Sequence, residues 1–168
     1  MPFLLLFLIQ TLAPTWDTPQ LFTAIISANV KLQPVLKQIH PNEWKGAPAS
    51  YQSQWESAVK ANQALQTHAA AVAKAPENLG ESLRLLEEVR DLNESLLELS
   101  GGVRQYQNPE LADLLDGMLA EGKAARDAYS QRVLDLAAQR EEQFDVADHE
   151  AQRCRAQLSS QPNKQTKR

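Results

Sequence analysis

Apolar residues recur along the chain at steps of three and four positions, and alternation of period two is almost absent. This spacing is typical of amphipathic helices, whose apolar side chains line one face. Prolines and glycines interrupt the pattern and divide it into four segments. The sequence therefore predicts helices over residues 18–39, 48–74, 77–100 and 109–158.

The first segment carries a start signal and an interruption. Thr18 can cap the helix, with Pro19 at the first helical position, where proline fits best. Pro34 lies inside the same segment and has no N–H to donate to the preceding turn. We therefore expect a kink or a split near Gln33.

The stretch between the third and last segments combines stop and start signals. Gly101 and Gly102 predict the end of the third helix, because glycine favours helix C-termini. Asn108 is the expected cap of the last helix, with Pro109 at its first position. The last helix should therefore begin only a few residues after the third one ends.

Stripes with a 3.5-residue period and short connections favour neighbouring helices that run nearly antiparallel. The predicted fold is all-α, an up-and-down four-helix bundle. The last helix, at roughly 70 Å, would be far longer than the second and third, at roughly 35 to 40 Å. It must bend near Gly122 or Arg140, or its end must project beyond the bundle. Its apolar stripe is Leu111, Leu115, Met118, Ala125, Tyr129, Val133, Leu136, Phe144, Ala147, Ala151, Cys154 and Leu158.

Asparagines interrupt three of the stripes, at positions 29, 62 and 93. A buried asparagine can fix the register of packed helices at a cost in stability. The same residues could lie at the solvent edge of each stripe, and we expect that edge position. A third alternative is that Asn29, Asn62 and Asn93 converge with Tyr129 on a cavity, as an enzyme with a distributed site would require.

The N-terminus contains an apolar run from Phe3 to Ala13. Its length suits a signal-peptide core and is too short for a spanning helix. No Lys or Arg precedes the run, and Pro14 follows Ala13, so the alternative is an apolar segment that packs on the domain. We expect an apolar leader over 1–16, trimming between Ala13 and Gln20, a bundle over 17–158, and a disordered polar tail over 159–168. The leader predicts an exported protein, periplasmic or secreted, with no stable membrane span after processing.

The net charge of −4 and the pI near 5.4 disfavour nucleic-acid binding, because phosphate recognition needs a clustered basic surface. The lysines and arginines are dispersed except in the tail. No nucleic-acid partner is expected.

Cys154 is the only cysteine, so no internal disulfide can form. Asp145 and His149 lie close to it in sequence, but on a helix Cys154 lies about 140° around the axis from His149. One ion could not join them from one helix, and no metal site is expected. The alternative is a metal held by His149, Asp145 and ligands from another helix. Cys154 shares a face with Ala147 and Ala151, where it should be a small buried apolar residue. If this end of the helix projects, an intermolecular disulfide and a homodimer become the alternative.

No motif for nucleophilic catalysis or phosphate binding is present, so no catalytic residue is predicted. A haem bundle needs axial ligands on facing helices, and His68 with Met118 is the one pair that the sequence offers. His68 lies on the flank of its stripe, which favours a surface or packing role. We expect no cofactor.

Aromatic residues cluster around the break between the first two helices. Trp55 lies on a stripe and predicts an aromatic plug at one end of the bundle. Trp44 joins no stripe, so it and His40 are candidates for a protein interaction surface, with the plug as the alternative for Trp44.

The segments LQPVLKQIHPNEW, YQNPELADLL and HEAQRC resemble those of small, uncharacterised exported helical proteins of soil bacteria. The resemblance implies an extracytoplasmic, bacterial, helical protein and carries no activity, cofactor or functional residue. We expect a non-enzymatic protein that acts through contacts with an unknown protein partner in the cell envelope or outside it. The alternative is a ligand- or haem-binding bundle.

Overall fold

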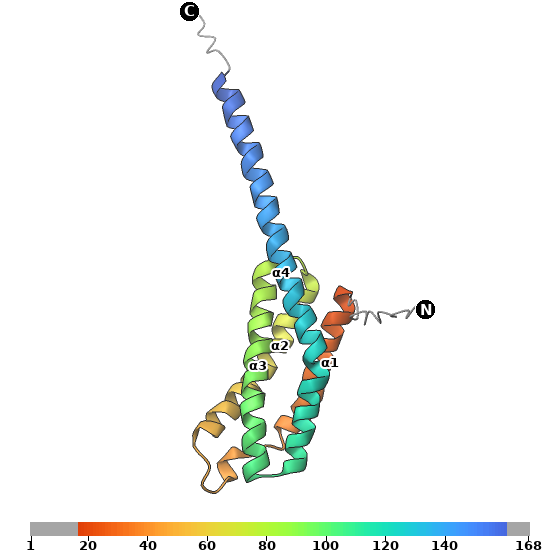
Figure 1. Ribbon diagram of the computed structural model, residues 1–168, viewed down its shortest axis with the longest axis vertical. Coiled ribbons are helices and arrows are strands. Elements are labelled where there is room, and N and C mark those ends of the chain that lie inside the picture. The colour runs from red at the N-terminus through yellow and green to blue at the C-terminus, as the bar shows by residue number, and fades with distance from the viewer. Residues whose placement is uncertain (1–16, 161–168) are drawn as a thin grey trace, which may run out of the picture.

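A computed structural model describes residues 17–160 of the chain. It contains the helices α1 (Thr18–Leu36), α2 (Ser50–Lys74), α3 (Leu79–Tyr106) and α4 (Pro109–Ser160), and a short 3-10 helix η1 (Pro41–Glu43). These residues include no strand, so the all-α prediction is confirmed. Figure 1 shows the helices side by side, with the C-terminal half of α4 standing clear of the others.

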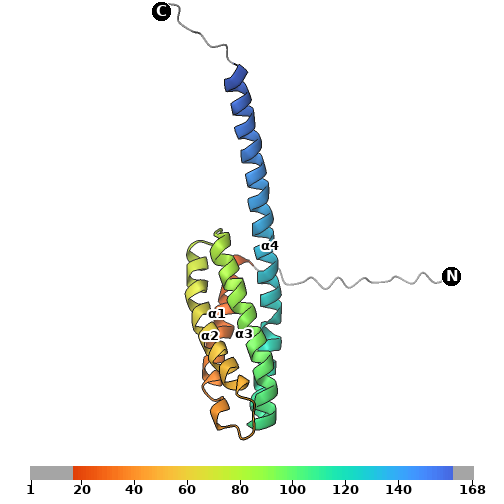
Figure 2. The same ribbon diagram turned by 90° about the vertical axis from the view of Figure 1, so that its left-hand side faces the viewer.

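The four helices pack in chain order around one core. α1 contacts α2, α2 contacts α3, α3 contacts α4, and α4 returns to α1, as expected of an up-and-down bundle. Figure 2 shows α4 along one edge of this bundle. The largest fully buried side chains come from α2, α3, α4 and the turn after α1: Tyr129, Ile39, Leu85, Leu99, Leu115, Val72 and Val103.

The start of α1 differs from the prediction by one residue. Asp17, not Thr18, is the cap, and its carboxylate accepts a hydrogen bond from the Gln20 N–H at 2.8 Å. The helix also continues through Pro34 and ends two residues later at Leu36, so it is not split at Gln33. Val35 and Leu36 are buried, and this packing favours the last turn in spite of the proline.

Gly101 and Gly102 do not end α3, which continues to Tyr106. Val103 is fully buried one residue further on, so its packing offsets the low helix propensity of two glycines. The predicted start of α4 is confirmed: α4 begins at Pro109, and the Asn108 side chain accepts a hydrogen bond from the Glu110 N–H at 2.8 Å.

α4 is one continuous helix of 52 residues, about 78 Å long at the usual rise. Leu136 is its last buried residue, and beyond Arg140 every side chain described is exposed except the half-buried Ala151. Of the two predicted alternatives, a bend or a projecting end, the structure shows that the end of α4 projects beyond the bundle. Arg140 stands where α4 leaves the bundle and donates to the Glu77 carbonyl of the α2–α3 turn at 2.7 Å.

The predicted leader (1–16) and most of the predicted tail (161–168) lie outside the described residues. Residues 159 and 160 belong to α4, so the helix extends two residues past the expected end of the domain. Within residues 17–160, none of the helices combines the length and the hydrophobicity needed to cross a bilayer.

Candidate functional site

The aromatic cluster at the α1–α2 break is packed inside the protein. The ring of Trp44 stacks on Tyr106 at 5.9 Å and meets the edge of Tyr51 at 5.4 Å. Only 8% of Trp44 is exposed, and its indole N–H donates to Gln107 Oε1 at 3.0 Å. The ring therefore closes one end of the bundle, whereas the neighbouring His40 is exposed. Of the two predicted interaction residues, only His40 presents its side chain to solvent.

Trp55 lies half-buried against the core, as the plug interpretation expects. Its indole N–H donates to the Leu36 carbonyl at 2.9 Å. Leu36 is the last residue of α1, and its carbonyl also accepts from the Ile39 N–H at 3.3 Å, so Trp55 and the following turn together satisfy the C-terminus of α1.

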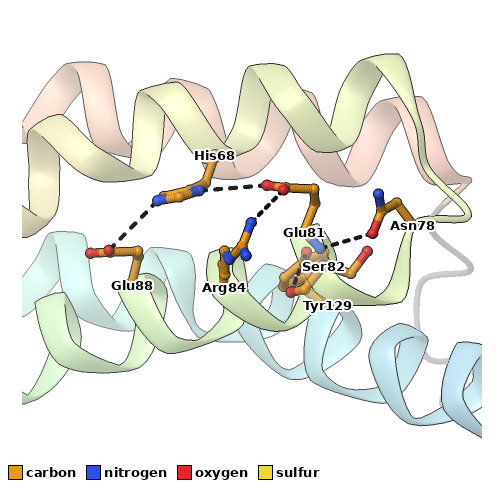
Figure 3. Close-up of polar contacts among 7 residues, drawn as sticks. All are labelled: His68, Asn78, Glu81, Ser82, Arg84, Glu88 and Tyr129. Carbon is orange, nitrogen blue, oxygen red and sulfur yellow. Dashed lines mark hydrogen bonds and ion pairs between the residues drawn. The ribbon is translucent and has the colours of Figure 1, made fainter.

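His68 lies between two carboxylates of α3, as Figure 3 shows. Its Nδ1 is 3.8 Å from Glu81 Oε2, and its Nε2 is 3.8 Å from Glu88 Oε1. The side chains of all three are about one quarter exposed. This arrangement links α2 to α3 and leaves no ring nitrogen turned toward Met118, which lines a cavity beside α1. The pair considered as haem ligands therefore does not converge.

A cavity of about 70 Å³ lies among the four helices, and its walls are almost entirely apolar. Its polar edges are Asn29 of α1, Asn93 of α3 and Arg126 of α4. A groove between α1 and α4 shares Ala28, Met118, Gly122 and Ala125 with it, so the cavity meets the surface along this seam. Tyr129 does not line it: the hydroxyl donates to the Ser82 carbonyl at 3.0 Å, as Figure 3 shows.

The expectation that the three asparagines lie at solvent edges is wrong for two of them. Asn29 and Asn62 are each 3% exposed, and Asn93 is half-buried. The Asn29 amide donates to the Asn62 backbone carbonyl at 3.0 Å, which fixes α1 against α2. The Oδ1 atoms of all three are buried and accept no hydrogen bond from the described protein residues. Asn29 and Asn93 are thus cavity-lining residues whose amide oxygens have no partner among the described protein residues.

Arg126 was not identified from the sequence, although it stands four residues after Gly122 on the inner side of α4. Its guanidinium folds back along the helix and donates to the Leu119 carbonyl at 2.7 Å. Burial lowers its pKa from the ordinary value, while attraction to Asp127 opposes this shift. Gly122 leaves the space that the guanidinium occupies, since a Cβ there would be 2.7 Å from Nη1. The spacing of four positions between Gly122 and Arg126, which places them on one helix face, was the sequence signal that could have indicated this contact.

The free end of α4 carries an apolar stripe that no part of the described chain covers. The stripe consists of Phe144, Ala147, Ala151, Cys154 and Leu158, and we call it the free stripe. Phe144 is 73% exposed and Leu158 71%. Cys154 is also exposed, so its expected burial is wrong: the bundle ends before the helix does.

Acidic residues and His149 surround the free stripe without forming a metal site. Asp145, His149 and Glu150 are all exposed. Within residues 17–160, no three His, Cys, Asp or Glu side chains lie together in a way that could hold a metal ion.

Comparison with known proteins adds no assignment to these sites. No protein-family model matches the chain, and neither the curated proteins nor the solved structures include a significant match.

Proposed function

We propose that the protein works through protein–protein contact, with the free stripe as its contact surface. One observation supports this proposal above the others: large apolar side chains are exposed on a segment that the bundle does not need. Burying a side chain such as Phe144 contributes about 1.5–3 kcal/mol. Burial of the stripe by a partner would stabilise the complex by this free energy, and the bundle would stay folded.

The proposal includes export to the periplasm or the exterior, supported by the apolar run Phe3–Ala13. Fractionation of cells that make the full chain tests this part. We expect the protein outside the cytoplasm with an N-terminus between Ala13 and Gln20. An intact Met1 in the cytoplasmic fraction would refute export and leave the contact surface untouched.

Site-specific photo-cross-linking tests the contact surface. A benzophenone amino acid replaces Phe144 on the free stripe or, as the matched control, Val146. Val146 is 54% exposed and lies about 200° around the helix from Phe144. We expect a discrete covalent adduct from position 144 and none from position 146. Equal labelling from both positions, or none from either, would refute a contact surface on this face.

The cavity supports a second candidate function, the binding of a small apolar molecule with an acidic or hydrogen-bonding group. Arg126 supplies a half-buried positive charge, and Asn29 and Asn93 add polar side chains to the lining. Native mass spectrometry of the purified full chain tests this function. We expect a bound small molecule that is lost in Arg126→Met, and a chain that carries only water would refute it.

A further inference from the structure

We propose that the partner of the free stripe is a second copy of this chain, and that the two free ends pair antiparallel. This inference rests on the proposed contact function and names its partner. The two bundles would then stand at opposite ends of a short two-helix contact, with the core of each bundle unchanged.

The spacing of the free stripe matches a second helix of the same kind. Its five residues are separated by 3, 4, 3 and 4 positions, which is the 3.5-residue repeat of paired helices. Small residues occupy the middle of the stripe and large ones its ends. A second copy in reverse direction, displaced by about 4.5 Å from full overlap, places Leu158 against Ala147 instead of against Phe144.

One register pairs four of the five stripe residues directly. Ala151 of each chain faces Cys154 of the other, and Ala147 faces Leu158. Phe144 then lies about 4.5 Å along the axis from the level of Leu158 of the second copy, within reach of its side chain. Ala151 and Cys154 at the centre let the two helices approach closely.

The flanking charges suit this register. In an antiparallel pair, positions on the same side of each stripe face one another across the contact. Asp148 of one chain then meets Arg155 of the other, twice by symmetry. On the other side, Glu150 meets Gln157. No two like charges face one another among these flanking residues.

A parallel pair is excluded because the second helix would collide with the bundle. Charge alone would allow one, because Glu150 of one chain would then meet Arg155 of the other. However, the free stripe continues the face of α4 that is buried in the bundle: Phe144 lies within about 20° of Val133, which is 2% exposed. A parallel second helix would run down this face into the α2–α3 turn, where Arg140 contacts Glu77.

The antiparallel arrangement avoids this collision. In the register given above, Arg140 of the second copy is level with a point about 7.5 Å beyond Ser160 of the first. Each bundle therefore lies past the end of the other chain's described helix. Figures 1 and 2 both show that the space beside the free end of α4 is not occupied by the bundle.

The test uses engineered cysteines in the full chain. One variant combines Ala147→Cys with Cys154→Ser, and a second, carrying a tag of different mass, combines Leu158→Cys with Cys154→Ser. The two are mixed with oxidised glutathione, so that each interchain disulfide converts one oxidised glutathione into two reduced molecules. A third variant, Val146→Cys with Cys154→Ser, replaces the first as the matched control.

We expect the mixture to give mainly the disulfide-linked heterodimer of positions 147 and 158. The control mixture should give at least tenfold less. Homodimers through 147 or through 158 as the main products would overturn the antiparallel orientation. A control that cross-links as well as the stripe variant would overturn the register.

Sedimentation equilibrium of the wild-type chain separates failure of this inference from failure of the proposed function. We expect the average mass to rise from one chain toward two with concentration. A monomer at every concentration would overturn the second copy as partner. If position 144 then still cross-links to another protein, the contact function stands; if it cross-links to nothing, both proposals fail.

Discussion

Gly102 of α3 lies directly against the ring of Tyr51 on α2. A Cβ at this position would stand 2.6 Å from Tyr51 Cε1 and 2.7 Å from Trp44 Cζ3. The glycine therefore sets the distance between the two helices at the aromatic end of the bundle.

Gly102→Ala should destabilise the protein by about 1–3 kcal/mol, because overpacking outweighs the gain in helix propensity. The neighbouring Gly101→Ala is the matched control, since its Cβ would meet nothing within 4 Å. It should stabilise the protein by about 0.5–1 kcal/mol. Denaturant unfolding measures both, and equal effects would contradict the close contact at Gly102.

Gln107 joins the α3–α4 turn to the segment after α1. Its Oε1 accepts from the His40 N–H and from the Trp44 indole, and its Nε2 donates to the Gln38 carbonyl at 2.6 Å. Gln107→Ala should cost about 2 kcal/mol of unfolding free energy. The exposed Gln105→Ala should cost less than about 0.5 kcal/mol. Equal losses of unfolding free energy in the two variants would show that the hydrogen bonds of Gln107 do not stabilise the protein.

Tyr129 gives the bundle a dependence on alkaline pH. Burial raises its pKa to about 12 from the ordinary 10.0, against the opposing effects of the Ser82 side chain and the positive charge of Arg132. The native state thus holds the proton more tightly than the unfolded state. This stabilisation is fully present below pH 10 and is lost as the pH rises to 12, by about 2 kcal/mol.

Tyr129→Phe isolates this effect. The variant loses the hydrogen bond to Ser82, at a cost of about 1 kcal/mol at neutral pH. Its stability should then fall less steeply than that of the wild type between pH 10 and 12. Unfolding curves across this range measure the difference, and parallel curves would contradict the role of Tyr129.

Arg155→Glu should weaken self-association about tenfold, because two attractive pairs with Asp148 become repulsive. Adding Asp148→Arg should restore it in the antiparallel pair, whereas in a parallel pair Glu150 would still face a glutamate. Arg153→Glu, on the outer face, is the matched control and should change little. Sedimentation equilibrium gives the dissociation constants, and a double variant as weak as Arg155→Glu would refute the antiparallel contact.

The helical fold could be predicted from the sequence because apolar residues spaced by three and four positions can be buried only on one face of a helix. The start of α4 followed from Asn108 and Pro109 for a similarly local reason. The Gly101–Gly102 pair misled the prediction because glycine suits a helix end and a close helix contact equally well. The contact of Gly102 with the rings of Tyr51 and Trp44, which are distant in sequence, shows that the glycine serves a close helix contact and not a helix end.

The candidate sites were harder to predict because burial depends on where the bundle ends. Asn29 and Asn62 are buried through their mutual contact, which no single stripe reveals. Cys154 follows the same spacing as the buried Val133, yet it lies beyond the last core layer. A periodic stripe thus predicts which face of a helix is apolar, and the neighbouring helices determine how much of it is covered.

Hydrogen exchange of residues 144–158 at increasing protein concentration tests the contact surface most directly. In the single chain these amides belong to a part of α4 that the described bundle does not cover, and they should exchange quickly. The account predicts that their protection rises with concentration while that of residues 109–136 stays constant. Fast exchange of 144–158 at every concentration would contradict pairing of the free ends.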